Sequence, residues 1–425
     1  MKSKFRRLIA AALEQRVKRL IKQKDLKVVA VTGSVGKTST KLVIAEVLSR
    51  KYKVLAHQGN YNSEIGLPLS IFELDTPSNL MNPISWVRIF NTIDRKIVSY
   101  PYDVLVLEMG ADEPGDIQKF MRYITPDIGV VTAIGPAHIE QFGSVEAIAE
   151  EKMKLAIGSK SVWLNEENER VMIELKKLPG GVRTYGVDKG NIHFTDLKRG
   201  ENLQFEGKIE IERELLAVKT QFVARHNLGA LAVAAGIGEE LGLESLQIKV
   251  GLENIKPFPG RMQVLLGVNG SVILDDTYNS SPLATEAALD ALYELPGRKI
   301  AILGSMNELG AMAEKAHREV GEAAGKVDLL VTIGDLAAKF ITAGAVSEGL
   351  GGDKIKTFDS PFAAGKYVRS IIQEGDVVLA KGSQNRVFAE EAVAKLLANP
   401  SDRPKLVRQG KKWHAIKQQQ FEDAS

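Results

Sequence analysis

The stretch Lys27-Val-Val-Ala-Val-Thr-Gly-Ser-Val-Gly-Lys-Thr-Ser39 decides the fold class. Val28–Thr32 has the short apolar, β-branched pattern of a buried strand, and a helical stretch of about Lys37–Arg50 follows the glycine-rich turn. A strand, such a turn and a helix form the setting of a phosphate-binding loop, whose glycines let backbone N–H groups approach phosphate oxygens. The residues that we expect to bind nucleotide here are Gly33, Ser34, Gly36, Lys37, Thr38 and Ser39.

An ordinary glycine-rich strand–helix turn is the alternative for this stretch. The first glycine of the longer Walker pattern is absent, because Val31 stands in its place. The phosphate loop is nevertheless favoured, because a Lys-Thr pair directly follows Gly36. In such a loop Lys37 supplies a point charge and Thr38 can hold Mg²⁺.

Outward from this loop, strand-like segments alternate with helical ones. This alternation predicts an α/β fold: a P-loop central ATPase domain with a doubly wound, mostly parallel sheet, and a C-terminal Rossmann-like domain. Residues 185–222 alternate in polarity and predict a small antiparallel insert. Pro257, Pro259 and Gly260 mark the clearest break. We therefore expect a basic amphipathic helix at residues 1–26, the central domain at 27–258, the C-terminal domain at 259–400 and a polar basic tail at 401–425.

The expected strands of the two domains are short apolar runs. Those of the central domain are Val28–Thr32, Val54–Ala56, Tyr102–Glu108, Ile128–Ala133 and Ser161–Leu164. Those of the insert are Asn191–Asp196, Leu203–Glu210 and Glu214–Phe222, and those of the C-terminal domain are Ser271–Leu274, Lys299–Leu303, Leu329–Ile333 and Asp376–Ala380.

Composition limits the function classes. The 425 residues are 44% hydrophobic and 26% charged, which is typical of a globular protein with more than one domain. A net charge of only +3 gives no reason to expect a nucleic-acid partner. The absence of cysteine excludes disulfides, thiolate zinc sites and a cysteine nucleophile. No apolar run approaches the roughly 20 residues that cross a bilayer. We expect a cytoplasmic protein, and separately we expect a monomer.

The first 24 residues contain nine basic side chains and one acid, Glu14, with apolar residues at helical spacing. We favour a terminal helix that packs its apolar stripe on its own domain. The alternative is that residues 1–24 make a peripheral contact with an anionic membrane. A second apolar helix, around Trp86, is expected within residues 75–100.

A carboxylate and a histidine follow neighbouring strands of the central domain. Glu108 ends an apolar strand, and a carboxylate at the carboxyl end of a parallel strand points into the nucleotide crevice, where it can bind Mg²⁺. His138 follows the next strand, although a lone histidine is more often structural than a ligand.

Several motifs together resemble the Mur ligase superfamily, and its MurF branch most closely. Thr32–Ser39 resembles the compact nucleotide loop of this family. Gly59-Asn-Tyr-Asn-Ser-Glu-Ile-Gly-Leu-Pro68 resembles the Asn-rich loop of MurF. Four further segments follow in the family's order: Pro259–Met262, Asp275–Asn279, Gly304–Gly310 and Lys381–Ser383.

The resemblance implies roles for individual residues. Lys37, His138, Lys152 and Arg261 would be catalytic, with Thr38, Glu108, His138 and Lys152 at the Mg²⁺ ions. Lys152 would be carbamylated, with Lys154 as its competitor. Asn165 and Asn227 would contact adenine, Arg261 the phosphates, Asp276 the ribose, and Tyr278 the closed cleft. The substrate-binding residues would be Asn60, Asn62, Ser63, Asn279, Glu308, Lys381 and Ser383.

Three features depart from the family pattern. Ala230 stands where the family has a second Asn, and Ser305 replaces an Asp. About 26 residues precede the nucleotide strand, too few for the N-terminal domain that holds UDP in MurF. The reaction type is therefore better supported than the substrate.

The implied activity is ATP-dependent amide formation through an acyl-phosphate in cell-wall precursor synthesis. A D-alanyl-D-alanine-like amine would be joined to a muramyl-peptide-type carboxylate. One alternative is a MurF-like ligase with a non-UDP or lipid-linked acceptor, and folate-type polyglutamylation is less favoured. The other is a Mur-like protein that binds nucleotide and ligates nothing. Ala230, Ser305 and the short N-terminal segment favour it, whereas intact Lys37, Thr38, Glu108, His138 and Lys152 oppose it.

Overall fold

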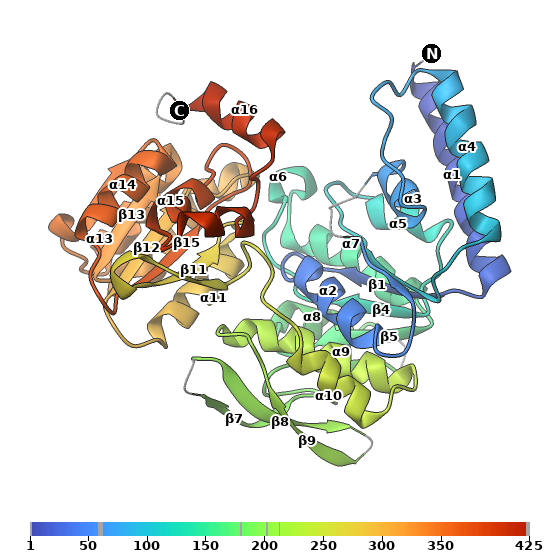
Figure 1. The fold of residues 1–425 in the computed structure, drawn as a ribbon, viewed down its shortest axis with the longest axis horizontal. Helices are drawn as coiled ribbons and strands as arrows, with labels where there is room; N and C mark the ends of the chain where they lie inside the picture. The colour runs from blue at the N-terminus through green and yellow to red at the C-terminus, as the bar shows by residue number, and fades with distance from the viewer. Residues whose placement is uncertain (1, 58–62, 179–180, 201–202, 212, 422–425) are drawn as a thin grey trace.

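The computed structural model describes residues 2–57, 63–178, 181–200, 203–211 and 213–421. Its central domain is built on a parallel sheet in the order β2-β3-β1-β4-β5-β6 (Figure 1). The strands are β1 (Lys27–Thr32), β2 (Val54–Leu55), β3 (Val104–Glu108), β4 (Ile128–Val131), β5 (Ser161–Asn165) and β6 (Arg183–Tyr185). Val31 pairs with Glu108 on one side and Val130 on the other. The carboxyl ends of three neighbouring strands therefore meet beside the glycine-rich loop, the crevice where open α/β sheets bind ligands.

Alternate residues of β1 face two separate cores. Val29 and Val31 pack with the helices α2 (Lys37–Leu48), α9 (Leu228–Glu240) and α10 (Ser245–Glu253). Val28 and Ala30 pack against the opposite layer. Its helices are α1 (Lys2–Lys24), α3 (Gly66–Ile71), α4 (Pro83–Val98), α5 (Asp116–Met121), α6 (Ile139–Phe142), α7 (Val145–Gly158) and α8 (Glu169–Leu175). This arrangement buries the sheet on both faces, which is why its strands read as continuous apolar runs.

The predicted antiparallel insert is present as the three-stranded sheet β7-β8-β9. It consists of β7 (Phe194–Arg199), β8 (Phe205–Ile211) and β9 (Glu214–Lys219). One face of it is apolar and joins the α2–α9–α10 core through Phe194, Phe205 and Ile209. The other face carries charged side chains, which explains the alternating sequence.

The C-terminal domain is a second α/β layer structure, with the sheet order β10-β11-β15-β12-β13-β14. Only β10 is antiparallel to its neighbour. The strands are β10 (Gln263–Leu266), β11 (Val272–Asp276), β12 (Lys299–Gly304), β13 (Leu329–Ile333), β14 (Ile355–Phe358) and β15 (Val377–Lys381). Helices α11 (Pro282–Tyr293), α12 (Ala313–Ala323) and α13 (Thr342–Ser347) cover one face, and α14 (Pro361–Ile371) and α15 (Glu390–Leu396) the other.

Short helical turns complete both domains. They are η1 (Arg225–Asn227), η2 (Val268–Gly270), η3 (Gly310–Met312), η4 (Ala324–Lys326), the π-helical η5 (Ala337–Ile341), η6 (Gly352–Lys354) and η7 (Pro400–Lys405). Sequence reasoning missed β6, β10 and β14, which all lie at sheet edges and are only partly buried.

Helices α1 and α4 lie side by side at the edge of the central domain, on the side away from the C-terminal domain (Figure 1). The apolar stripe of α1, formed by Ile9, Leu13, Val17 and Leu20, is buried in the domain core. The structure thus has the packed terminal helix that the sequence favours. Among the described residues no helix is long and apolar enough to span a bilayer.

The tail contains the helix α16 (Lys411–Gln420), which a buried charge cluster fastens to the C-terminal domain. Lys417 lies 2.8 Å from the Glu390 carboxylate and 2.6 Å from that of Glu391, and all three side chains are almost fully buried. Arg408 pairs with Glu390 at 2.6 Å. The sequence predicts only a polar basic tail at residues 401–425, because composition does not indicate which charged side chains are buried.

Candidate active site

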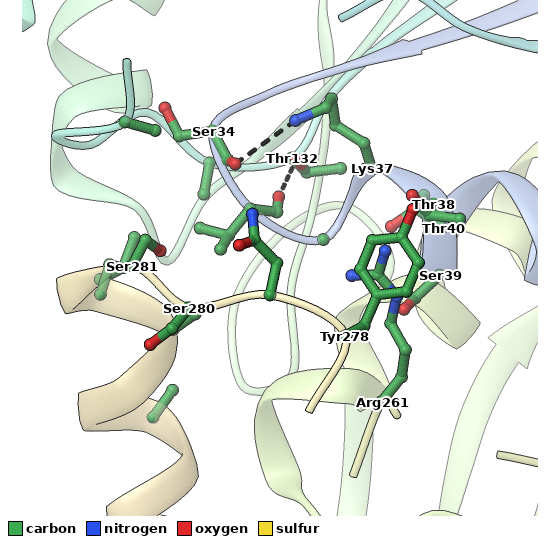
Figure 2. Close-up of a pocket in the computed structure, with 18 of the residues that line it drawn as sticks. Ser34, Lys37, Thr38, Ser39, Thr40, Thr132, Arg261, Tyr278, Ser280 and Ser281 are labelled. Atoms are coloured by element: carbon green, nitrogen blue, oxygen red, sulfur yellow. Dashed lines mark hydrogen bonds between the residues drawn. The ribbon is translucent and has the colours of Figure 1, made fainter. Parts of the chain in front are cut away.

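A cavity of about 540 Å³ lies between the two domains. Its walls combine the glycine-rich loop, the carboxyl ends of the central strands and loops of the C-terminal domain (Figure 2). Most of the residues expected from the sequence line it: Ser34, Gly36, Lys37, Thr38, Ser39, Glu108, His138, Asn165, Asn227, Arg261, Asp276, Tyr278, Asn279, Glu308, Lys381 and Ser383.

The glycine-rich loop is held against β4. The Ser34 N–H donates to Ala133 O at 2.6 Å. The Thr132 hydroxyl donates to Val35 O at 2.5 Å, as the dashed line at Thr132 in Figure 2 shows. Gly33 has φ 150°, and a Cβ there would come within 2.0 Å of the Thr132 hydroxyl oxygen. Glycine is therefore required at position 33. Lys37 Nζ donates to Gly33 O at 2.8 Å, so its ammonium lies at the mouth of the loop.

Glu108 lies at the base of the cavity with only 6% of its surface exposed. Thr38 Oγ1 donates to Glu108 Oε2 at 2.9 Å, and Lys41 Nζ lies 3.3 Å from the same oxygen. Burial alone would raise the pKa of Glu108, but the ammonium groups of Lys37 and Lys41 and the Thr38 hydroxyl bring it below its ordinary value. Glu108 is therefore an ionised carboxylate.

This carboxylate and hydroxyl fit a Mg²⁺ ion, which is bound through one or two carboxylates with water and substrate phosphates as its other ligands. Within the described residues no group of three or more His, Cys, Asp or Glu side chains converges as a complete metal site. An ion here would therefore depend on nucleotide phosphates. The phosphate loop beside Glu108 supplies the setting for that sharing.

His138 joins the two domains. It has φ 56° at the start of α6, and its Nδ1 lies 2.7 Å from the Glu308 carboxylate of the C-terminal domain. Its Nε2 lies 3.5 Å from Asp112. Hydrogen bonding to His138 lowers the pKa of Glu308. The expected metal-side histidine and the expected substrate-side glutamate are thus partners in this structure.

Lys152 and Lys154 differ sharply. Lys154 is 40% exposed and pairs with Glu151 at 2.6 Å, so it points away from the cavity. Lys152 is 2% exposed and makes no hydrogen bond or ion pair within the described chain. Burial first, and then the nearby Lys37 charge, lower its pKa to about 7. Lys152 does not line the cavity itself. It is nevertheless close enough for the charges of Lys37, Asp112 and Glu108 to shift its pKa.

The C-terminal wall of the cavity is a connected set of polar contacts. The Arg261 guanidinium stacks 4.0 Å from the centre of the Tyr278 ring, as Figure 2 shows. Lys381 Nζ lies 2.5 Å from Asp276 Oδ2 and donates to Asn279 O at 3.0 Å. Ser383 Oγ accepts from the Asn307 N–H at 2.9 Å.

The two residues that we expect to contact adenine also line this cavity. Asn165, at the end of β5, and Asn227, before α9, line it together with Ala230. Asn165 Oδ1 accepts from the Glu167 N–H at 3.1 Å, which orients its amide. Ser305, which replaces the family's Asp, accepts a hydrogen bond from the Ala337 N–H at 3.1 Å. Its hydroxyl therefore binds a backbone group of the C-terminal domain.

Some expected residues lie elsewhere. Asn60 and Asn62 are outside the described residues. Ser63 does not line the cavity, and its Oγ accepts from the Gly66 N–H at the start of α3. Gly33 shapes the loop from behind.

Sequence reasoning missed Lys41, Thr132 and Asn168. Thr132 and Asn168 are polar residues just after β4 and β5, a position that could have identified them. Lys41 gives no such signal, because it reads as a surface residue of α2 although it is 2% exposed.

Comparison with known proteins agrees with this geometry. Residues 31–238 match the Mur ligase middle domain, and residues 260–384 match the Mur ligase glutamate ligase domain. The UDP-N-acetylmuramoyl-tripeptide–D-alanyl-D-alanine ligase of Synechocystis sp. is 32% identical over 381 residues, covering 88% of this chain and 75% of that protein. The enzyme of the same name from Bacillus subtilis is 29% identical over 402 residues, covering 92% and 80%.

Solved structures give the same result. The MurF ligase of Thermotoga maritima, in complex with ADP, superimposes with a TM-score of 0.76 and 28% identity over 93% of this chain and 84% of that one. The matches to both domains, the level of identity and the shared fold lead to one conclusion: the chain belongs to the Mur ligase family.

Proposed function

We propose that this protein is an ATP-dependent ligase of the MurF type, which adds D-alanyl-D-alanine or a similar amine to a muramyl-peptide-type carboxylate. The observation that carries the proposal is the cavity that is lined both by the phosphate loop and by Glu308 and Lys381 of the C-terminal domain. We place the reaction in the cytoplasm, where ATP is available, and expect a monomer.

In the first step the substrate carboxylate attacks the γ-phosphorus of ATP, and ADP leaves. The product is an acyl-phosphate, a far better electrophile than a carboxylate. Lys37 and Arg261 stabilise the charge on the transferring phosphoryl group from opposite domains. Mg²⁺ held by Thr38, Glu108 and the phosphates would add neutralising charge at the same oxygens.

In the second step the amine attacks the acyl carbon, phosphate leaves with its bridging oxygen, and the amine loses a proton. Asn279, Glu308, Lys381 and Ser383 lie on the wall where the amine substrate would bind. Glu308 is a carboxylate with a lowered pKa, so it can hold an ammonium group. Approach of the two domains excludes water, which would otherwise hydrolyse the acyl-phosphate.

A non-catalytic, nucleotide-binding role is the second candidate. Ala230 and Ser305 favour it, because Ala230 lacks the amide and Ser305 lacks the carboxylate that the family pattern contains at these positions. Ser305 nevertheless fills a defined backbone position, and the charged set around Glu108 is intact. We therefore favour the ligase.

The environment of Lys152 supports the proposed carbamate. A carbamate forms when a neutral amine attacks CO₂ and releases one proton, so a lysine must first be uncharged. A pKa of about 7, produced by burial, keeps much of Lys152 neutral near neutral pH. The carbamate would place a negative charge on this buried side chain, near the Lys37 ammonium.

Replacing Lys152 by alanine is expected to reduce ligation by about 10²–10³-fold, as removal of one charged group from a transition-state site does. Short carboxylic acids should restore part of the activity by supplying the missing anion. Lys154→Ala is the matched control, because Lys154 is exposed and its ion pair is with Glu151. The measurement is the ligation rate with and without added acetate. Full activity in Lys152→Ala, or an unmodified Lys152 in an ordered, metal-loaded site, would refute the carbamate.

The proposed function is tested by ADP release from purified protein. Turnover should require both a muramyl-peptide carboxylate and D-alanyl-D-alanine, with one amide formed per ADP. Nucleotide binding without turnover across a panel of acid and amine pairs would favour the non-catalytic role.

A further inference from the structure

The α1–α4 pair, which consists of residues 2–24 and 83–98, has a charge unlike that of the rest of the chain. It contains twelve Lys and Arg residues and two acids, Glu14 and Asp94, so its net charge is +10. The whole chain has a net charge of +3, which leaves −7 for all other residues. The net positive charge of the protein therefore comes from this pair, since the remaining residues together are acidic.

The same pair exposes apolar side chains. Fourteen large apolar residues are exposed among the described residues, and six of them belong to the pair or to the loop that enters α4: Leu8, Leu80, Met81, Ile84, Val87 and Val98. Leu8, Ile84 and Val87 are 69%, 63% and 57% exposed. Clusters of exposed apolar residues mark interaction surfaces.

The two helices run parallel, which brings these residues, except Val98, to one end. Arg16 and Arg19 pair with Asp94, and Lys24 donates to Val98 O at 2.8 Å. Continued toward the N-terminus, this register puts Leu8 at the level of Ile84. Figure 1 shows this end of the pair projecting from the domain, with the start of the chain beside it. We call this end, residues 4–8 and 80–88, the tip.

The tip is rigidly held and is not a loose segment. Trp86 is 1% exposed, and its Nε1 donates to Leu80 O at 2.8 Å. Asn82 caps α4 by accepting from the Ile84 N–H, and the Arg16 guanidinium lies 4.3 Å from the centre of the Phe90 ring. Because the apolar stripe of α1 is already buried in the core, the exposed residues face outward in a fixed arrangement.

We propose that the tip docks on an anionic lipid bilayer. Lys4, Arg6, Arg7 and Arg88 would lie among the acidic headgroups, while Leu8, Ile84 and Val87 enter the boundary with the acyl chains. Nucleic acid would match the charge but would leave these apolar side chains in water. The pair lies on the side away from the C-terminal domain, so docking leaves the cavity free to open and close (Figure 1). This proposal does not depend on the ligase activity.

The test is co-sedimentation of the full chain with vesicles. Phosphatidylcholine vesicles with roughly one-third phosphatidylglycerol are compared with pure phosphatidylcholine vesicles, at about 0.05 M and 0.5 M salt. The tip variants are Ile84→Glu/Val87→Glu and Arg6→Glu/Arg7→Glu. The matched controls alter exposed residues elsewhere: Leu246→Glu on α10 and Lys326→Glu/Lys366→Glu in the C-terminal domain. Thermal unfolding shows that each variant folds.

We expect binding to the anionic vesicles that weakens at high salt. Each basic residue near such a surface contributes on the order of fivefold in affinity, so Arg6→Glu/Arg7→Glu should weaken binding roughly 25-fold or more. Ile84→Glu/Val87→Glu should lose it comparably, and the controls should bind like the parent. Absence of binding in every condition would overturn the proposal. Loss in Arg6→Glu/Arg7→Glu with full binding in Ile84→Glu/Val87→Glu would also overturn it, because it would indicate a polyanion partner.

Discussion

Lys37→Ala is expected to reduce ATP-dependent ligation by about 10³-fold or more while leaving the protein folded. The Lys37 ammonium is the only cation in the described residues of the glycine-rich loop 33–39, and its contacts are the carbonyl oxygens of Gly33 and Ser34. These contacts add little stability to the fold. Loss of the Lys37 side chain should therefore weaken the stabilisation of the ATP phosphates and leave the free energy of unfolding nearly unchanged. Lys37 also helps to keep the pKa of Glu108 low, so the variant weakens the carboxylate site as well.

Lys53→Ala is the control for this change, because Lys53 is an exposed lysine of the same domain. Rates of amide formation and thermal unfolding are measured for both variants. Lys37→Arg separates charge from geometry, since a guanidinium carries the same charge but is larger and planar. Activity of Lys37→Ala within a few-fold of the parent would exclude the phosphate-loop role.

Lys417→Met should lower the free energy of unfolding by about 3–5 kcal/mol, because it leaves buried carboxylates with too little positive charge. Glu390 and Glu391 are 0% and 1% exposed, and Lys417 Nζ lies within 2.8 Å of both. The same cluster holds Arg408, which donates to the carbonyl oxygens of Thr277 and Tyr278 at 2.6 and 2.9 Å. The variant should therefore also raise the KM for ATP, because Tyr278 stacks on Arg261 in the cavity.

Lys412→Met is the matched control on the same helix, since Lys412 is exposed and lies outside the cluster. Urea unfolding and the KM for ATP are compared for the two variants. If both unfold at the parent's denaturant concentration, the cluster does not anchor the tail.

The nucleotide half of the site could be predicted because its chemistry follows strand ends. β1, β3 and β4 have continuous apolar runs. The residues at or after their carboxyl ends, such as Lys37, Thr38, Glu108 and His138, converge because the strands are parallel and aligned. The resemblance added the C-terminal residues, such as Arg261 and Lys381, which the structure places in the same cavity.

What the sequence could not predict depends on burial. Lys41, Lys152 and Lys417 read as solvated helix residues, yet each is at most 2% exposed. Their environment is set by packing of segments far apart in the chain, such as α16 against α15. Edge strands such as β14 were missed because partial exposure weakens their apolar pattern. The contact of His138 with Glu308 depends on the relative position of the two domains. Local sequence patterns carry no information about that position.

The central claim is that the carboxylate is activated as an acyl-phosphate, and oxygen transfer tests it most directly. The acceptor carboxylate is labelled with ¹⁸O and incubated with ATP, Mg²⁺, D-alanyl-D-alanine and the enzyme, and the released phosphate is analysed by mass spectrometry. The account predicts one ¹⁸O atom in each phosphate for each amide formed, because the bridging oxygen leaves with the phosphorus. Amide formation with unlabelled phosphate would contradict it.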